Sequence, residues 1–172
     1  ATVLLTLNRL LELHLSRPEL MQLGLSLGAD VPFFVCEQTA WASGIGEQLQ
    51  PAPVLPSAWY VLVNPKVSVS TAQVYGKLGL TSPGHTTRLP RFPGTIAELV
   101  EQLHNDLERV TVAEYPVVAE IKQRLLELGA VGALLSGRGP TGFGVFSSAT
   151  AAVAAAAALA GFPWKVYAVE PL

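Results

Sequence analysis

The chain has 172 residues and a mass of 18.2 kDa, the size of one domain or of two small ones. Half of the residues are hydrophobic and only 14% are charged, which excludes an intrinsically disordered chain, because such chains bury too little apolar surface to offset their loss of conformational entropy. The formal net charge of −2 gives no electrostatic case for nucleic-acid binding. The longest near-continuous apolar run, residues 151–162, is too short for a membrane-spanning helix, which needs about 20 residues.

The scarce cysteine and histidine residues limit the chemistry that the chain offers. A single cysteine, Cys36, excludes a disulfide framework and is typical of a reducing compartment such as the cytoplasm. The three histidines lie far apart in the sequence without ligand-spaced cysteines or carboxylates beside them, so we expect no metal site in the protein. No basic segment or cleavage pattern opens the chain, so we expect no signal peptide.

The first predicted helix has no capping residue before it. Its apolar residues recur at the spacing of one helix face: Val3, Leu4, Leu7, Leu10 and Leu11. We expect this helix to run to about Leu15. Because it begins uncapped in mid-pattern, we also expect that the chain is a piece of a longer protein and that an apolar face is left exposed.

A capping box predicts the second helix. Ser16 and Glu19 have the required spacing, and Gly28 is expected to end the helix in the left-handed conformation. Beyond Gly28 the sequence predicts, in order, a tight turn at 29–32, a short apolar strand at 33–35, a second strand at 39–42, a turn at 44–46 and a proline-rich linker at 51–56.

Residues 57–172 alternate strands and helices. We expect strands at 59–63, 131–135, 142–146 and 165–169, helices opening at 70 and 95, a helix around 117–128 that Gly129 ends, an alanine-rich helix at 149–160, and a long loop at 79–94. The order strand, helices, strand, strand, helix, strand is that of a ferredoxin-like split βαβ unit. The chain is therefore predicted to be α+β, with residues 1–56 and 57–172 as two domains.

Asp30 is the strongest candidate for a catalytic residue. It lies on a turn between Gly28 and Pro32 rather than on a solvated helix face, and it can act as a general base if a substrate hydroxyl comes within reach. Turns are also where aspartate is ordinarily found, so Asp30 can instead serve only as a turn or helix cap. The residues alone leave both interpretations open.

The segment from Ser136 to Gly142 contains three glycines and two hydroxyls between predicted strands. In such a segment consecutive backbone N–H groups can converge on an anion, and Arg138 can add charge-assisted contacts with a phosphate. The alternative is a plain hairpin loop whose glycines only satisfy positive φ.

Two further groups of residues have a functional and a structural interpretation. Thr71 and Tyr75 are four residues apart at the start of a predicted helix, so they share a face that can stack on a base and bind a sugar or phosphate. A half-buried surface tyrosine is the structural alternative. The polar segment 104–108 is interpreted as structural, as a cap followed by a helix start.

Several segments together resemble the kinases of the GHMP superfamily (galactokinase, homoserine, mevalonate and phosphomevalonate kinases). The segment Leu27–Phe34 (LGADVPFF) is similar to a signature that contains an acidic residue. The other similar segments are 1–8, which resembles the helix after the phosphate loop, 44–47, which resembles a Gly-Val-Gly-Glu turn, 64–71, which opens the second domain, 105–108, a recurring tetrapeptide, and 136–141, the third GHMP motif.

The resemblance implies a GHMP-kinase-like fold and a kinase activity. Residues 1–56 would be the remainder of the N-terminal domain, and 57–172 the ferredoxin-like C-terminal domain. The implied reaction is ATP-dependent phosphorylation of the 2-hydroxyl of a cytidine-diphosphate-linked methylerythritol, a step of the non-mevalonate route to isoprenoid precursors. Mg²⁺ is expected to accompany the nucleotide. The implied partners are these small molecules, without nucleic acid or membrane, and no oligomeric state is indicated.

The resemblance also assigns residue roles. Asp30 would take the hydroxyl proton or orient the nucleophile, Ile45 and Gly46 would form a wall of the cytidine pocket, Thr71 would contact the diphosphate or erythritol, Tyr75 would stack on the cytosine, and the phosphate-loop support would be Ser136, Gly137, Arg138, Gly139 and Thr141. Two positions depart from the family pattern, which usually has Ser or Thr at Arg138 and a bulkier apolar residue at Gly142. The family's phosphate loop and catalytic lysine would precede Ala1, so the chain alone is expected to be inactive.

Two alternatives stay open. One is another GHMP kinase of the homoserine or mevalonate type. The absence of the acceptor-site segments of those kinases and the presence of Tyr75 argue against it. The other is a non-catalytic ferredoxin-like binding module, which would explain residues 57–172 but would leave Asp30 and the preceding helices without a role.

Overall fold

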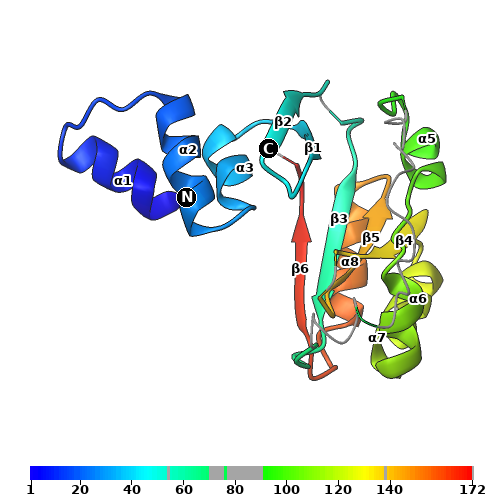
Figure 1. The fold of residues 1–172 in the computed structure, drawn as a ribbon. Coiled ribbons are helices and arrows are strands. Elements are labelled where there is room, and N and C mark those ends of the chain that lie inside the picture. The colour runs from blue at the N-terminus through cyan, green and yellow to red at the C-terminus, as the bar shows by residue number, and fades with distance from the viewer. Residues whose placement is uncertain (54, 70–75, 77–90, 138, 172) are drawn as a thin grey trace. The chain divides into compact units, whose positions relative to one another are not determined.

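The computed structural model describes residues 1–53, 55–69, 76, 91–137 and 139–171 (Figure 1). The chain divides into two compact units, residues 1–54 and 55–172. The helix predicted to open at residue 70 lies outside the described residues, as does most of the loop predicted at 79–94. None of the described helices is long and apolar enough to cross a membrane.

Three helices and a hairpin form the first unit. Its elements are α1 (Thr2–Leu10), α2 (Arg17–Leu27), α3 (Val31–Cys36), β1 (Ala40–Ser43) and β2 (Gln48–Pro51). β1 and β2 pair antiparallel, with Ala40 opposite Pro51 and Ser43 opposite Gln48. The predicted second strand and its turn are therefore present, whereas β2 was missed because its sequence is mostly polar.

Helix α1 is shorter than predicted because Asn8 binds the chain that follows. The Asn8 amide donates to the Leu15 carbonyl over 3.0 Å and accepts from the Leu15 N–H over 3.0 Å, which folds residues 11–15 back instead of continuing the helix. The helix buries none of its residues, and Val3 and Leu10 are 69% and 72% exposed. The expected exposure of its apolar face is confirmed.

The region between α2 and α3 contains one confirmed and two wrong predictions. The capping box of α2 is present, with the Ser16 N–H donating to the Glu19 carboxylate over 2.7 Å. Gly28 is extended, with φ of 168°, and not left-handed. Residues 33–35 are helical and not a strand, and Pro32 lies in the first turn of α3, where its missing N–H costs nothing.

The second unit is a four-stranded antiparallel sheet with helices. Its elements are β3 (Trp59–Asn64), α5 (Ile96–Glu101), α6 (Glu108–Glu114), α7 (Pro116–Glu127), β4 (Gly132–Leu135), β5 (Gly142–Phe146), α8 (Ala149–Ala158) and β6 (Lys165–Val169). The sheet order is β4-β5-β3-β6, and each neighbouring pair is antiparallel. This order confirms the ferredoxin-like arrangement.

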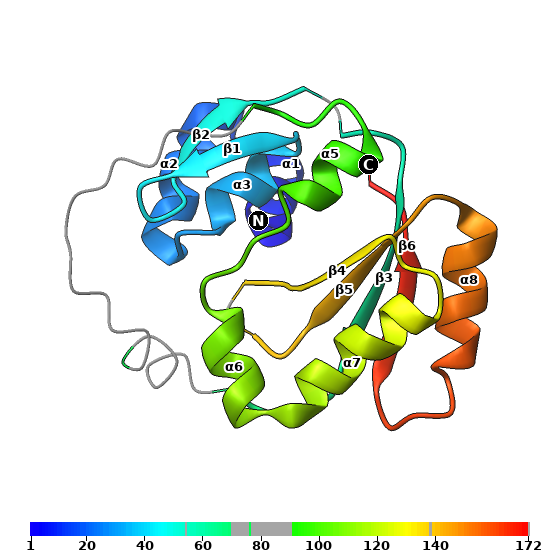
Figure 2. The same ribbon diagram turned by 90° about the vertical axis from the view of Figure 1, so that its right-hand side faces the viewer.

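Helices cover one face of this sheet (Figure 2). α7 lies against β4 and β5, and α8 lies against β3 and β6. Along β3, Val61 and Val63 are fully buried under the helices, while Tyr60 and Leu62 alternate with them on the other face and are partly exposed. The core residues are Val61, Val63, Ile121, Leu125, Ala130, Phe146, Ala152, Ala155 and Leu159.

Candidate functional site

Asp30 lies between α2 and α3 with a carboxylate that does not cap a helix. Its backbone is in the right-handed helical region, at φ −82° and ψ −15°, and it holds the N-cap position of α3. Its exposed side chain makes no capping hydrogen bond with that helix. A residue that served only as a cap would accept such a bond from an N–H of the first turn. The carboxylate is therefore accessible for another partner.

Close packing of α2 on α3 fixes the backbone beside Asp30. Gly24 is buried in the middle of α2, and a Cβ built on it would lie only 2.8 Å from Cγ1 of Val31, the residue that follows Asp30. On α3, Pro32 and Val35 are buried. The sequence holds one signal for this role of Gly24, because a glycine inside a helix costs about 1 kcal/mol relative to alanine and so indicates a packing reason.

The turn between β1 and β2 is held by a carboxylate. Glu47 accepts a hydrogen bond from the Ile45 N–H over 2.8 Å, and Gly46 N–H donates to the Ser43 carbonyl over 3.1 Å. Hydrogen bonds from the Glu47 and Ile45 backbone lower the pKa of the Glu47 carboxyl. These bonds stabilise the turn above the ordinary pKa of glutamate, and their contribution is lost as the pH falls through the lowered value.

Asp30 and Gly46, two of the sequence-predicted site residues, lie side by side within the first unit. A Cβ built on Gly46 would be 3.8 Å from Oδ1 of Asp30 and 3.6 Å from the carbonyl oxygen of Ala29. Ile45, the neighbouring predicted residue, is 76% exposed. The structure therefore places a backbone segment without a side chain, at Gly46, next to the exposed carboxylate of Asp30.

Replacing Gly46 with alanine is expected to lower the free energy of unfolding by about 1 kcal/mol, because Gly46 has φ of +117°, which residues with a Cβ rarely adopt. Chemical denaturation of the Gly46→Ala variant measures this loss. Gly28→Ala is the matched control in the same unit, since Gly28 is extended and a Cβ there meets Val31 at an ordinary 3.7 Å. Equal losses in the two variants would contradict the argument.

The glycine-rich loop, residues 136–141, lies between β4 and β5 in the chain. The Ser136 N–H donates to the Thr141 carbonyl over 2.8 Å, and Gly137 is left-handed with φ of +60°. Ser136 N–H is thus used inside the loop and is not among the groups that can bind an anion. Arg138 lies outside the described residues.

Asn64, at the end of β3, forms hydrogen bonds both with the glycine-rich loop and with Lys66, which follows β3. Its side-chain amide donates to the Thr141 hydroxyl over 2.8 Å, and its side-chain oxygen Oδ1 accepts from the Lys66 N–H over 2.8 Å. Because the Thr141 oxygen already accepts a hydrogen bond, its own proton can be donated to a bound ligand. Asn64 belongs to the segment 64–71, which resembles the start of the second domain of GHMP kinases, but this role of Asn64 has no signal in the sequence.

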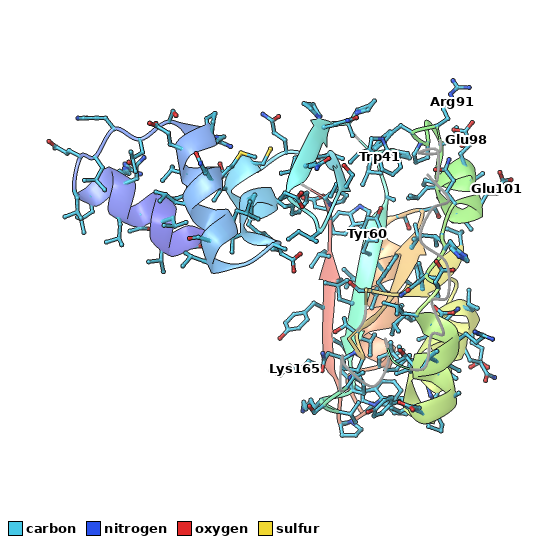
Figure 3. The ribbon with its side chains drawn as sticks, in the orientation of Figure 1. Trp41, Tyr60, Arg91, Glu98, Glu101 and Lys165 are labelled. Atoms are coloured by element: carbon cyan, nitrogen blue, oxygen red, sulfur yellow. The ribbon has the colours of Figure 1, made fainter. Side chains whose placement is uncertain are left out.

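A shallow cavity of about 270 Å³ borders this loop on the sheet face away from the helices. It is lined by Leu62, Asn64, Thr141, Lys165 and Tyr167. Figure 3 labels Lys165 at the start of β6 and Tyr60 toward the opposite end of β3. The cavity therefore lies at the end of the sheet where Asn64 pairs with Lys165.

The remaining predicted site residues cannot be placed. Thr71 and Tyr75 lie outside the described residues. Among the residues that the structure does describe, no three histidine, cysteine or carboxylate side chains gather as a metal site would require.

Gly142, one of the two departures from the family pattern, is buried where α7 packs closely. A Cβ built on it would lie 3.0 Å from Cγ2 of Ile121.

Comparison with known proteins agrees with this architecture. Residues 91–164, which include the glycine-rich loop, match the sequence family described as GHMP kinases C terminal. The homoserine kinase of Cytophaga hutchinsonii shares the fold, with a TM-score of 0.58 at 18% identity over 96% of this chain and 62% of its own. Part of the chain thus matches the C-terminal region of GHMP kinases, and the resemblance to that superfamily seen in the sequence is confirmed.

Curated relatives that match the whole chain share the name of one kinase. The 4-diphosphocytidyl-2-C-methyl-D-erythritol kinase of Syntrophotalea carbinolica is 57% identical and that of Geobacter sulfurreducens 48% identical, each over 100% of this chain. A crystal structure of 4-(cytidine 5′-diphospho)-2C-methyl-D-erythritol kinase matches 98% of this chain with a TM-score of 0.78 at 31% identity. The chain spans 62% of the length of each of these relatives.

Proposed function

We propose that a full-length kinase including this chain transfers the γ-phosphoryl group of ATP to the 2-hydroxyl of 4-diphosphocytidyl-2-C-methyl-D-erythritol, in the non-mevalonate synthesis of isoprenoid precursors. The observation that carries the proposal is the exposed carboxylate of Asp30, which makes no capping hydrogen bond and lies beside the backbone of Gly46. The names of the relatives that match the whole chain supply the substrate class. Both substrates are charged and water-soluble, and we expect the reaction to take place in the cytoplasm.

Asp30 would act on the attacking hydroxyl. In the reaction the hydroxyl oxygen forms a bond with the γ-phosphorus, the bond from that phosphorus to the bridging oxygen breaks, and ADP leaves. Asp30 would accept the proton of the hydroxyl or orient the oxygen. Phosphoryl transfer depends mainly on positioning and electrostatic stabilisation, so a base supplies only part of the rate.

Other residues would hold the two substrates. The glycine-rich loop would support the phosphates of the nucleotide through the backbone of Gly137 and Gly139 and the hydroxyls of Ser136 and Thr141. Arg138 would add charge-assisted contacts with a phosphate. Ile45 and Gly46 would form a wall of the cytidine pocket, Thr71 would bind the diphosphate or erythritol, and Tyr75 would stack on the cytosine. Mg²⁺ bound to the nucleotide would neutralise phosphate charge.

A direct assay tests the proposal. The full-length kinase is incubated with ATP, Mg²⁺ and one acceptor in each of three reactions. The acceptors are 4-diphosphocytidyl-2-C-methyl-D-erythritol, homoserine and mevalonate. ADP release is followed, and phosphorus NMR identifies the product. Of the three acceptors, we expect only the cytidine compound to support ADP release, and we expect a new phosphate monoester on its 2-hydroxyl. Phosphorylation of homoserine or mevalonate instead, or of none of the three, would contradict the proposed function.

A further inference from the structure

Asn105 binds the glycine-rich loop from a distant segment of the second unit. Its side-chain amide donates to the Leu135 carbonyl over 2.9 Å and to the Gly137 carbonyl over 2.6 Å, across 30 and 32 residues of sequence. Its side-chain oxygen accepts from the Leu107 N–H over 3.0 Å, which anchors the amide to the start of α6. These three hydrogen bonds use both amide hydrogens and the side-chain oxygen of Asn105.

Glu108 completes this attachment on the same residue of β4. Its carboxylate accepts from the Leu135 N–H over 3.0 Å and forms an ion pair with Lys122 of α7. Among the residues that the structure describes, β4 is an edge strand of this sheet and pairs with β5 alone. The backbone N–H and C=O of Leu135 are therefore both satisfied by side chains of residues 105–108, where a second strand would otherwise be needed.

The position of these bonds matters for the loop more than for the sheet. The Leu135 carbonyl and the Ser136 N–H belong to one planar peptide group, and Asn105 holds one side of it while the Thr141 carbonyl holds the other. The second bond of Asn105 holds the carbonyl of Gly137, the left-handed residue of the loop. A glycine there loses more conformational freedom on ordering than any other residue, and the hydrogen bond from Asn105 restricts that freedom.

We propose that Asn105 is a positioning residue of the kinase, which holds the glycine-rich loop in the conformation that binds the nucleotide phosphates. The proposal rests on the proposed function for its ligand, but the restraint on the loop is a property of the fold. Asn105 acts through the loop and does not contact the substrates. The segment 104–108 was interpreted as structural from the sequence, and the proposal gives one of its residues a functional consequence.

The test compares Asn105→Asp with a control that weakens the same unit elsewhere. Asn105→Asp keeps the acceptor for Leu107 and replaces the two amide donors with an oxygen that repels the two carbonyls. Ala152→Gly is the control, because Ala152 is fully buried on α8, which packs on β3 and β6, and its replacement lowers stability through the helix. Asn105→Ala, which removes all three bonds, is the second variant. All are made in the full-length kinase.

Two measurements are made on each folded variant. Hydrogen–deuterium exchange of the peptide that covers residues 135–142 reports on the loop, and we expect it to be about tenfold faster in Asn105→Asp and unchanged in Ala152→Gly. Calorimetric titration with ATP and steady-state kinetics report on the ligand. We expect Kd and KM for ATP to rise about tenfold in Asn105→Asp, with kcat within about threefold of wild type.

The outcomes separate the two proposals. Equal changes in loop exchange in the Asn105 variants and in Ala152→Gly would overturn the positioning role, as would faster loop exchange with an unchanged Kd for ATP. A wild-type protein that binds ATP but phosphorylates no acceptor would contradict the proposed function alone, because the exchange and ATP-binding measurements would still decide the role of Asn105.

Discussion

Replacing Asp30 with asparagine in the full-length kinase is expected to lower kcat by about 10²–10⁴-fold, the usual range for the loss of a general base. Asparagine preserves the size of the side chain and removes the negative charge and the basicity. The affinity for the acceptor substrate should change far less, because the backbone of Asp30 is held by the packing of α2 on α3 rather than by its carboxylate. Steady-state kinetics and a melting curve of the same variant measure both effects.

Glu37→Gln is the matched control for Asp30→Asn. Glu37 follows the other end of α3 and forms an exposed ion pair with Arg17 at 3.0 Å, so its neutralisation removes one charge from the same helix with little effect on stability. We expect this variant to keep wild-type turnover. If Asp30→Asn also stays within a few-fold of wild type, Asp30 is only a turn residue.

Replacing Gly137 with valine is expected to weaken ATP binding by about 10- to 100-fold, because a non-glycine residue in the left-handed region costs about 1–3 kcal/mol. Gly137 has φ of +60°, and a β-branched side chain would move the loop out of that conformation. Binding would then have to restore the strained conformation. Calorimetric titration of the full-length variant with ATP measures the change in Kd.

Gly139→Val separates backbone conformation from side-chain bulk. In contrast to Gly137, Gly139 has no φ in the left-handed range, and a Cβ built there meets no atom within 4 Å. A conformational effect therefore predicts a much larger change in Kd for Gly137→Val than for Gly139→Val. Similar losses in both variants would show that bulk near the ligand, and not the left-handed residue, decides binding.

Most of the second unit could be predicted from local sequence patterns. β3, β5 and β6 are short apolar or alternating runs bounded by glycine, proline or asparagine, and these signals place strands well. α7 has regular apolar spacing and ends before Gly129 as expected, and Gly129 has a positive φ of +93°. Such patterns lie within one element and need no knowledge of its partners.

The first unit was harder to predict because its short elements depend on their neighbours. An apolar run of three residues fits a strand or a helix equally well, and α3 becomes a helix through its packing on α2. Gly28 was assigned the usual glycine conformation at a helix end, but the next helix begins only three residues later and requires an extended link. Asn8 ends α1 through a contact seven residues away.

The candidate site shows the same limit. Asp30 and the glycine-rich loop could be identified from residue types and their resemblance to a family. The contact of Gly46 with Asp30 and the bonds of Asn105 with the loop could not, because each depends on tertiary structure across 16 to 32 residues of sequence. A polar residue whose partners are distant has no local signal that distinguishes it from an ordinary helix cap.

The strand order of the second unit also determines when that unit can fold during synthesis. β3 is an inner strand, yet Tyr60 pairs with Val145 on one side and with Val169, more than a hundred residues later, on the other. During synthesis on the ribosome, β3 is made before β5 and β6, so its apolar side chains and backbone have neither neighbouring strand to pair with until those strands are made. Contacts this distant in sequence slow folding and leave strand edges open to aggregation. Production of this protein should therefore depend on chaperone capacity and on the rate of translation.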